Sequence, residues 1–217
     1  MSDSLIDLLV KGTWETIVMT FVSGFFGFLI GLPTGVLLFL TRKNQILEQK
    51  VLNRILSVVV NVFRSIPFII LIVWMIPFTR AIVGTSIGVS AALVPLSIGA
   101  APFIARLVEN SLLGLPSGLI EAARALGATP LQIVYKVLLP EALPSLINAA
   151  SITLITLVGY SAMGGAVGAG GLGQVGYQYG YIGYDALTMN SVLALLVLLV
   201  FLIQFAGDAL SKRFDHR

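Results

Sequence analysis

Few residues in this sequence could carry out chemistry. The 217 residues contain no cysteine and a single histidine, His216, beside the C-terminus, so no thiolate site and no histidine-based metal centre is expected. No paired carboxylates and no Ser/His/Asp set stand at catalytic spacing. Six glycines fall between positions 164 and 173, but a phosphate-binding loop also needs a lysine followed by Ser or Thr, and none follows. We therefore expect a non-catalytic chain with no metal and no cofactor of its own.

The polar residues with an informative spacing lie between Pro116 and Pro140, in an otherwise apolar sequence. The first half of this stretch predicts a short helix with Ser117 as its N-cap. Gly127 is suited to the left-handed residue that stops such a helix. The predicted apolar face comprises Leu119, Ala122, Ala123 and Leu126.

The second half of the stretch predicts another helix that starts at once. Thr129 is the expected N-cap, Pro130 takes the first helical position, and Gln132 completes a capping box. Pro140 is expected to end the helix. The predicted apolar face comprises Leu131, Val134, Tyr135 and Leu138.

Each of these helices is about 15 Å long, too short to cross a hydrocarbon core about 30 Å thick. We therefore expect the stretch to lie beside the membrane as a docking surface. Ala122 and Ala123 would let another protein approach the helix backbone closely, and Glu121 and Arg124 would fix the register by opposite charges.

The spacing Glu-Ala-Ala, three residues, Gly127, nine residues and Val-Leu-Leu-Pro resembles the EAA loop of bacterial ABC-importer permeases. Val137 replaces the isoleucine usual in that family. The resemblance covers nearly the whole chain, and the segments 63–78 and 159–184 are similar to the methionine-importer permease in particular. It implies that this loop is a cytoplasmic coupling helix seated in a groove of an ATPase subunit. The implied coupling residues are Glu121, Ala122, Ala123, Arg124, Gly127, Val137 and Pro140.

The resemblance also implies an assembly. Two copies of the chain would form a pathway around a twofold axis, and two separate ATPase subunits, which hold the ATP and Mg²⁺, would dock on the cytoplasmic face. A periplasmic or lipid-anchored protein would deliver methionine. The implied location is the bacterial inner membrane, and the implied fold is that of a type I ABC-importer permease.

Composition independently predicts an all-α polytopic membrane protein. Hydrophobic residues make up 57% of the chain, charged residues 11%, and the mean hydropathy is +0.99. Apolar runs predict five spans, within a permease domain at 13–207 flanked by the short tails 1–12 and 208–217. The predicted spans are 16–41, 55–79, 81–105, 145–167 and 186–206.

The basic residues predict the orientation of these spans. Eleven of the 13 fall in segments on one side, against Lys11 and Arg80 on the other. The positive-inside rule then places the N-terminus outside and the C-terminus inside. Topology accounts for the net charge of +3, so no nucleic-acid partner is expected.

Two features within the spans have alternative interpretations. Ser23, Gly27, Gly31 and Gly35 form a small-residue stripe, which indicates close helix packing or a pore lining. Arg64, three residues before Pro67, either extends to the cytoplasmic surface or pairs inside the bundle and anchors it.

The candidate gate lies where the fourth span meets the glycine run. Met163 can close a narrow apolar pathway and repack when it opens, with Gly164, Gly165 and Gly168 as neighbours. A methionine that fills a gap in the bundle is the alternative. The glycines either break the helix or permit backbone contact. The tyrosines that follow are interface anchors or a surface for a binding protein.

Two other function classes compete with an ATP-driven importer. A secondary transporter or channel should carry ionisable residues at mid-membrane and often an internal repeat. Arg64 is the only marginal charge inside the predicted spans, and five spans do not divide into equal halves. A non-transporting scaffold would make the EAA spacing accidental.

Overall fold

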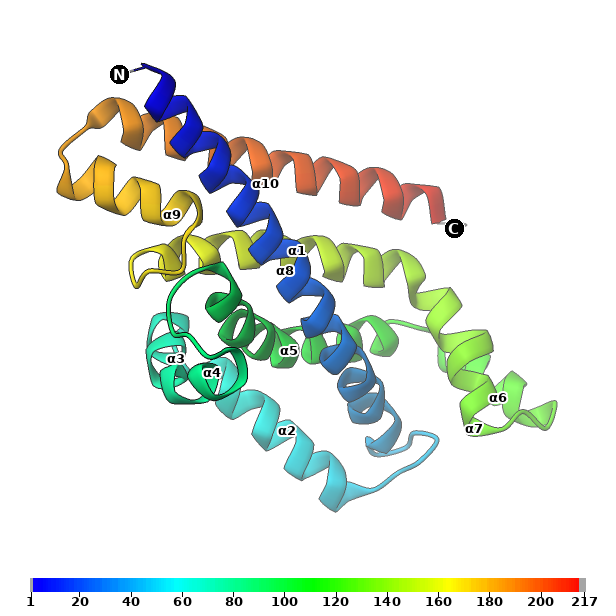
Figure 1. Cartoon of the computed structure of the whole chain (residues 1–217). Coiled ribbons are helices and arrows are strands. Elements are labelled where there is room, and N and C mark those ends of the chain that lie inside the picture. The colour runs from blue at the N-terminus through cyan, green and yellow to red at the C-terminus, as the bar shows by residue number, and fades with distance from the viewer. Residues whose placement is uncertain (1, 215–217) are drawn as a thin grey trace.

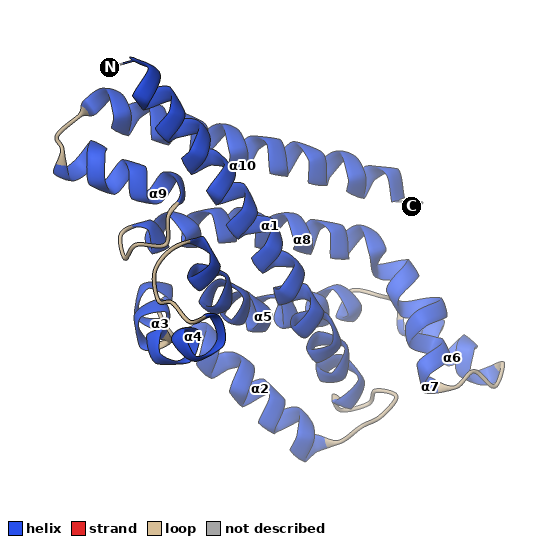
Figure 2. Cartoon of the chain, in the orientation of Figure 1, coloured by secondary structure: helices blue, strands red, loops and turns tan. Residues whose placement is uncertain are grey.

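The computed structural model describes residues 2–214, with side chains from residue 5 onward, and its described residues are helical with no strand (Figure 2). The long helices are α1 (Ser2–Thr41), α5 (Val89–Leu113), α8 (Leu139–Gly165) and α10 (Ala186–Phe214). The shorter elements are α2 (Lys50–Ser65), α3 (Phe68–Trp74), α4 (Ile76–Val83), α6 (Ser117–Ala125), α7 (Pro130–Ile133), α9 (Gly171–Val175) and the π-helical segments η1 (Val134–Leu138) and η2 (Gly176–Ile182).

Four helical stretches among the described residues are long and apolar enough to cross a membrane, and the bent pair α2–α3 makes up to five. These stretches are Leu5–Thr41, Val89–Leu113, Pro130–Gly165 and Ala186–Phe214. The expected all-α fold with several apolar spans is confirmed. His216 lies outside the described residues.

The expectation that residues 55–79 form one continuous helix is wrong. The chain breaks at Ile66 and Pro67, and α2 and α3 are bent by 98° at this break. Pro67 lacks an N–H and forces the preceding residue out of the helical region, so Ile66 is extended with φ −79° and ψ 123°.

The expected outer turn at Arg80 is also displaced. Arg80 lies inside α4, which ends at Gly84, where the backbone turns left-handed with φ +81°. The next helix therefore begins at Val89 and ends at Leu113, eight residues later at each end than the predicted 81–105.

The other helices contain most of each predicted span and extend beyond it. α1 begins at Ser2 instead of residue 16, and α10 runs on to Phe214 instead of residue 206. α8 ends at Gly165, two residues before the predicted limit of 167. Helices can continue past the hydrocarbon boundary, so an apolar run marks the buried part of a helix and not its ends.

The small-residue stripe of α1 packs against α5, as predicted from its spacing. A Cβ atom built on Gly31 would lie 2.7 Å from the carbonyl oxygen of Ala101. One built on Gly35 would lie 2.5 Å from that of Ala105. Ser23 is fully buried on the same helix. Small residues therefore bring the two backbones together, which matters in lipid, where hydrophobicity does not drive helices to associate.

Gly35→Ala is expected to destabilise the bundle, because the added methyl group meets backbone and the helices must separate. Overpacking of this kind costs about 1–3 kcal/mol. Gly118→Ala is the matched control, since a Cβ there meets nothing within 4 Å and the φ of Gly118 is not positive. The thermal midpoint of the purified protein should fall for Gly35→Ala alone, and equal midpoints for the two variants would contradict this packing.

The glycine run ends α8 and places the next segment against α1. Gly165 and Gly173 meet with no room for a side chain on either, so both expectations for the run, a helix break and a close backbone contact, hold. The N–H of Gly171 donates to Oε2 of Glu15 at 2.7 Å, and the N–H of Leu172 donates to Oγ1 of Thr16 at 2.9 Å. Side chains of α1 thereby fix the start of α9.

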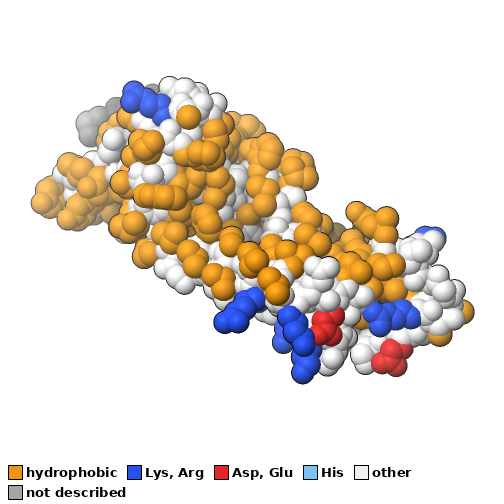
Figure 3. All heavy atoms as spheres, turned by 90° about the horizontal axis from the view of Figure 1, so that it is seen from below, with side chains coloured by type: hydrophobic (Ala, Val, Ile, Leu, Met, Phe, Trp, Pro, Cys, Tyr) orange, Lys and Arg blue, Asp and Glu red, His pale blue; other side chains and the backbone are white. Residues whose placement is uncertain are grey.

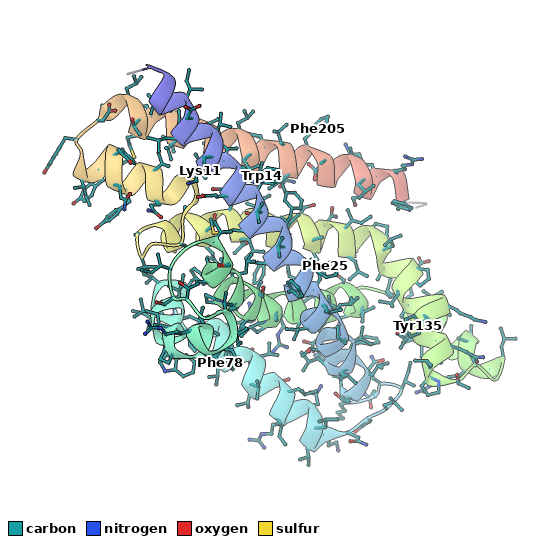
Figure 4. The ribbon with its side chains drawn as sticks, viewed as in Figure 1. Lys11, Trp14, Phe25, Phe78, Tyr135 and Phe205 are labelled. Carbon is teal, nitrogen blue, oxygen red and sulfur yellow. The ribbon has the colours of Figure 1, made fainter. Side chains whose placement is uncertain are left out.

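The two ends of the molecule differ in charge. The N-terminus, α9 and the start of α10 lie at one end, whereas the start of α2, α6, α7 and the C-terminus lie at the other (Figure 1). Hydrophobic side chains cover much of the face in Figure 3, and charged ones gather along one edge and toward one end. Large apolar side chains, among them Trp14, Phe25 and Phe205, project outward (Figure 4). Lipid or a second chain must cover such a surface.

Candidate functional site

The loop between α5 and α8 forms the predicted helix, turn and helix. Gly127 is left-handed, with φ +77°, and the N–H of Ala128 donates to the carbonyl oxygen of Ala123 at 3.1 Å across the turn. This bond is the one expected where a left-handed residue ends a helix. The predicted role of Gly127 in the turn is confirmed.

The caps of the two helices have different outcomes. Oγ1 of Thr129 accepts from the N–H of Gln132 at 3.4 Å, and Oε1 of Gln132 accepts from the N–H of Thr129 at 2.9 Å, so the predicted capping box is present. The predicted Ser117 cap is wrong, because Pro116 occupies the N-cap position and no side chain caps α6.

Pro140 does not end the second helix. The chain stays helical from Pro130 through η1 into α8, as far as Gly165. In η1 the N–H of Leu139 donates to the carbonyl oxygen of Val134, a π-type bond in a turn wider than the α-helical one. The missing N–H of Pro140 then falls in the first turn of α8, where it is tolerated. This half of the loop is therefore one end of the long apolar helix Pro130–Gly165.

The expected apolar faces of the loop are also wrong in part. Leu126, Leu131 and Tyr135 are 89%, 67% and 65% exposed, and Tyr135 projects from its helix (Figure 4). Val134 and Leu138 of the predicted faces are buried as expected, and Ile133, which lies outside those faces, is buried too. Apolar side chains that point outward from a polar loop indicate a protein-binding surface, which is the role expected of this stretch.

The predicted coupling residues divide into exposed and internal ones. Ala123 is buried and packs on the chain's own core, and Val137 is half-buried against it, so neither offers its side chain to a partner. Pro140 is exposed at the start of α8. We define the coupling surface as the exposed residues Glu121, Ala122, Arg124, Leu126, Gly127, Leu131 and Tyr135.

A buried carboxylate lies just before this loop. Glu109 on α5 is 3% exposed. One of its oxygens accepts from Arg106 at 2.5 Å, and the other lies 3.6 Å from Nη1 of Arg42. Arg106 also donates to Oδ1 of Asn61 at 2.8 Å. The cluster joins α5 to the end of α1 and to α2, and the sequence analysis did not foresee it.

The expected bundle anchor, Arg64 with Pro67, has no ionic partner in the described part of the chain. Arg64 is exposed in the last turn of α2, and Pro67 is the N-cap of α3. Among the described residues, the ion pairs that tie elements of the bundle together are those of Glu109, not of Arg64.

The predicted gate residues lie at the end of α8. Met163 is 50% exposed, Gly164 and Gly165 are buried, and Gly168 is left-handed with φ +87°. Ile152, Gly159 and Met163 are exposed, and Thr156 is half-buried. Their spacing of four, three and four residues places them on one face of α8, so this face is largely uncovered in the single chain.

Comparison with known proteins gives consistent matches. Residues 27–217 match the family of binding-protein-dependent transport system inner membrane components. The chain is similar to the D-methionine transport system permease protein MetI of Escherichia coli K12, with 74% identity over 165 residues, or 76% of each chain. It is 49% identical to the probable MetI of Pasteurella multocida Pm70 over all of both chains.

Solved structures agree with the sequence matches. A chain of the MetNI methionine ABC transporter in an inward-facing conformation is 72% identical, with a TM-score of 0.98 and all of both chains covered. A chain of an amino acid ABC transporter is 19% identical with a TM-score of 0.79 over 98% of this chain and 96% of that one, and it shares the fold.

Proposed function

Because this chain belongs to the family of binding-protein-dependent transport system inner membrane components, we propose that two copies of it form the pathway of an ATP-driven methionine importer. The chain is a membrane-spanning translocation subunit of the bacterial inner membrane. The observation that carries the substrate is the 72% identity, over its whole length, to a chain of the MetNI methionine ABC transporter.

The coupling surface is the proposed seat of the ATPase subunits. It combines exposed apolar side chains with one charge of each sign, Glu121 and Arg124, a composition suited to a specific protein contact. ATP and Mg²⁺ would be held by the ATPase subunits, and this chain would supply no catalytic group. Closure of the ATPases would move the loop and change which side of the pathway is open.

The outer end is the proposed contact for a periplasmic or lipid-anchored binding protein. Tyr177, Tyr179, Tyr181 and Tyr184 are all exposed there, and Tyr184 is 93% exposed. Tyrosine is enriched in protein interfaces because it combines an apolar ring with a hydroxyl group.

Co-purification followed by reconstitution tests the proposal. The tagged chain should bring an ATPase subunit with it from its host membrane, and proteoliposomes of the complex with the methionine-binding protein should accumulate methionine only when ATP is inside. Glu121→Lys should release the ATPase, whereas Glu48→Lys, an exposed charge change outside the coupling surface, should not. Uptake without ATP would instead support a secondary transporter or channel.

The proposed orientation, with the N-terminus outside and the C-terminus inside, predicts a labelling pattern. The chain has no native cysteine, so any labelling of a single-cysteine variant comes from the introduced residue. An impermeant thiol reagent added from the periplasm should label Tyr181→Cys but neither Gln49→Cys nor Gly118→Cys, all three being exposed positions. The opposite pattern would reverse the topology.

We also propose that Met163 meets its twofold mate and closes the pathway. Met163→Cys should then form a cross-link between two subunits in the resting state. In the complex that carries Met163→Ala, the ATPase subunits should hydrolyse ATP without import of methionine. Ile155→Cys, half-buried on another face of α8 and packed within its own chain, is the matched control and should not cross-link. A Met163 that fills a gap in the bundle would give no cross-link, and its truncation would mainly cost about 2–5 kcal/mol of stability.

A further inference from the structure

Arg64 lies in the last turn of α2, far along the helix from the basic residues at its start. Fourteen residues separate it from Lys50 at the start of α2, which corresponds to about 21 Å along the helix axis. The hydrocarbon core is about 30 Å thick, so an α2 that crosses the core from Lys50 would carry Arg64 deep into it. An ionisable group at that depth normally faces a water-filled cavity or binds a partner.

Arg64 lines a cavity beside the break between α2 and α3. The cavity has a volume of about 110 Å³. The other lining residues include the aromatic residues Phe63, Phe68, Phe103 and Tyr160, together with Gly99 of α5. Phe68 and Tyr160 are stacked, with ring centroids 4.3 Å apart. The cavity therefore combines one cation with an aromatic wall.

This combination is suited to a small amino acid. A guanidinium group binds a carboxylate through two parallel hydrogen bonds, and aromatic rings make favourable contacts with a thioether sulfur. The break also ends α2 at Ser65, and the last carbonyl groups of a helix lack intrahelical donors, so they can accept from an ammonium group. Broken spanning helices are a general setting for solute sites in transporters.

Polar residues also recur along α2 between this cavity and the start of the helix. Asn53, Ser57, Asn61 and Arg64 follow one another at spacings of four, four and three residues, which places them along one side of the helix. On the other side of the cavity, Tyr160 precedes Met163 by three residues on α8. The cavity therefore lies between the proposed gate and this row of polar residues.

We infer that this cavity is an amino-acid subsite within the membrane domain, in which Arg64 binds the α-carboxylate and the aromatic rings contact the side chain. The inference rests on the proposed function for its ligand, methionine. Each subunit of a dimer would carry one such subsite. The volume suits the carboxylate and part of the side chain, and the remainder of the ligand would extend into the pathway.

Direct binding of labelled methionine to the permease–ATPase complex in nanodiscs, without the binding protein, tests the inference. Arg64→Gln should weaken binding by about 10-fold or more, since it removes a charge-assisted pair. Arg64→Lys should retain part of the affinity. Arg54→Gln, an exposed arginine on the same helix outside the cavity, is the matched control and should bind as the wild type does.

Methioninol, which has no carboxylate, separates binding from a structural role. The wild type should prefer methionine to methioninol, and Arg64→Gln should lose that preference while keeping the thermal midpoint. If Arg64→Gln still preferred methionine to methioninol, the proposed subsite would be wrong. It would also be wrong if Arg64→Gln bound methionine normally and only made the thermal midpoint depend on anionic lipid. ATP-dependent methionine uptake by the wild-type complex is measured separately. Failure of this uptake would contradict the proposed function, whereas normal uptake together with unchanged binding by Arg64→Gln would contradict only the subsite.

Discussion

Gly127→Val is expected to abolish import while leaving the protein in the membrane. Gly127 has φ +77°, a conformation that a β-branched residue resists. A Cβ at this position meets nothing within 4 Å, so the cost is backbone strain confined to the turn and not a clash with the core. Strain of about 1–3 kcal/mol corresponds to a reduction of the docked population by about 5- to 150-fold.

Gly118→Val is the matched control for this prediction. Gly118 lies in the same loop, a Cβ there also meets nothing within 4 Å, and its φ is not positive. ATP-driven methionine uptake and co-purification of the ATPase should fail for Gly127→Val and persist for Gly118→Val. Equal loss in both variants would mean that added bulk on the surface, and not the left-handed turn, prevents docking.

Glu109→Ala is expected to be strongly destabilising. The substitution leaves Arg106, whose side chain is 22% exposed, without its carboxylate, and removal of one partner from a buried pair costs about 3–5 kcal/mol. Arg42 is half-exposed, so its own pairing contributes little. Glu109→Gln should have an intermediate effect, because an amide oxygen can still accept from Arg106.

Glu48→Ala is the control for the charge cluster, because Glu48 and Lys50 form an exposed pair at 3.8 Å. Such a pair contributes about 0–1 kcal/mol. The thermal midpoint in nanodiscs should fall sharply for Glu109→Ala and little for Glu48→Ala. If the two variants melt together, the buried cluster does not hold α1, α2 and α5 in place.

Local turn chemistry was readable from the sequence, because it is decided within a few residues. Gly127, Thr129 and Gln132 take their predicted positions. The two prolines show where this reasoning fails. Pro67 breaks a helix that hydropathy made continuous, whereas Pro140 lies in a helix that it was expected to end. Leu138 and Ala142 are fully buried on either side of Pro140, so packing keeps that segment helical.

The candidate site was predictable to a different degree. The EAA spacing located the loop, but the exposure of its side chains depends on tertiary packing, in which Ile133 and Val134 join the core while Leu126 stays outside it. The Arg42–Glu109 pair joins residues 67 positions apart, and the Arg64 cavity combines α2, α3, α5 and α8. Single-sequence patterns contain no signal for such long-range contacts.

One continuous helical stretch, Pro130–Gly165, connects the loop with the predicted gate at Met163. Its 36 residues correspond to a path of about 54 Å along the helix axis, and this path changes direction between the α7 and α8 labels (Figure 1). Spin labels at its two ends would show whether the distance between those ends stays constant through the ATP cycle. The π-helical turn near the loop has poorer hydrogen bonds than an α-helix, and bending would concentrate there. A small displacement of the coupling surface would therefore be transmitted along the helix to Met163, with the bending concentrated at the π-helical turn.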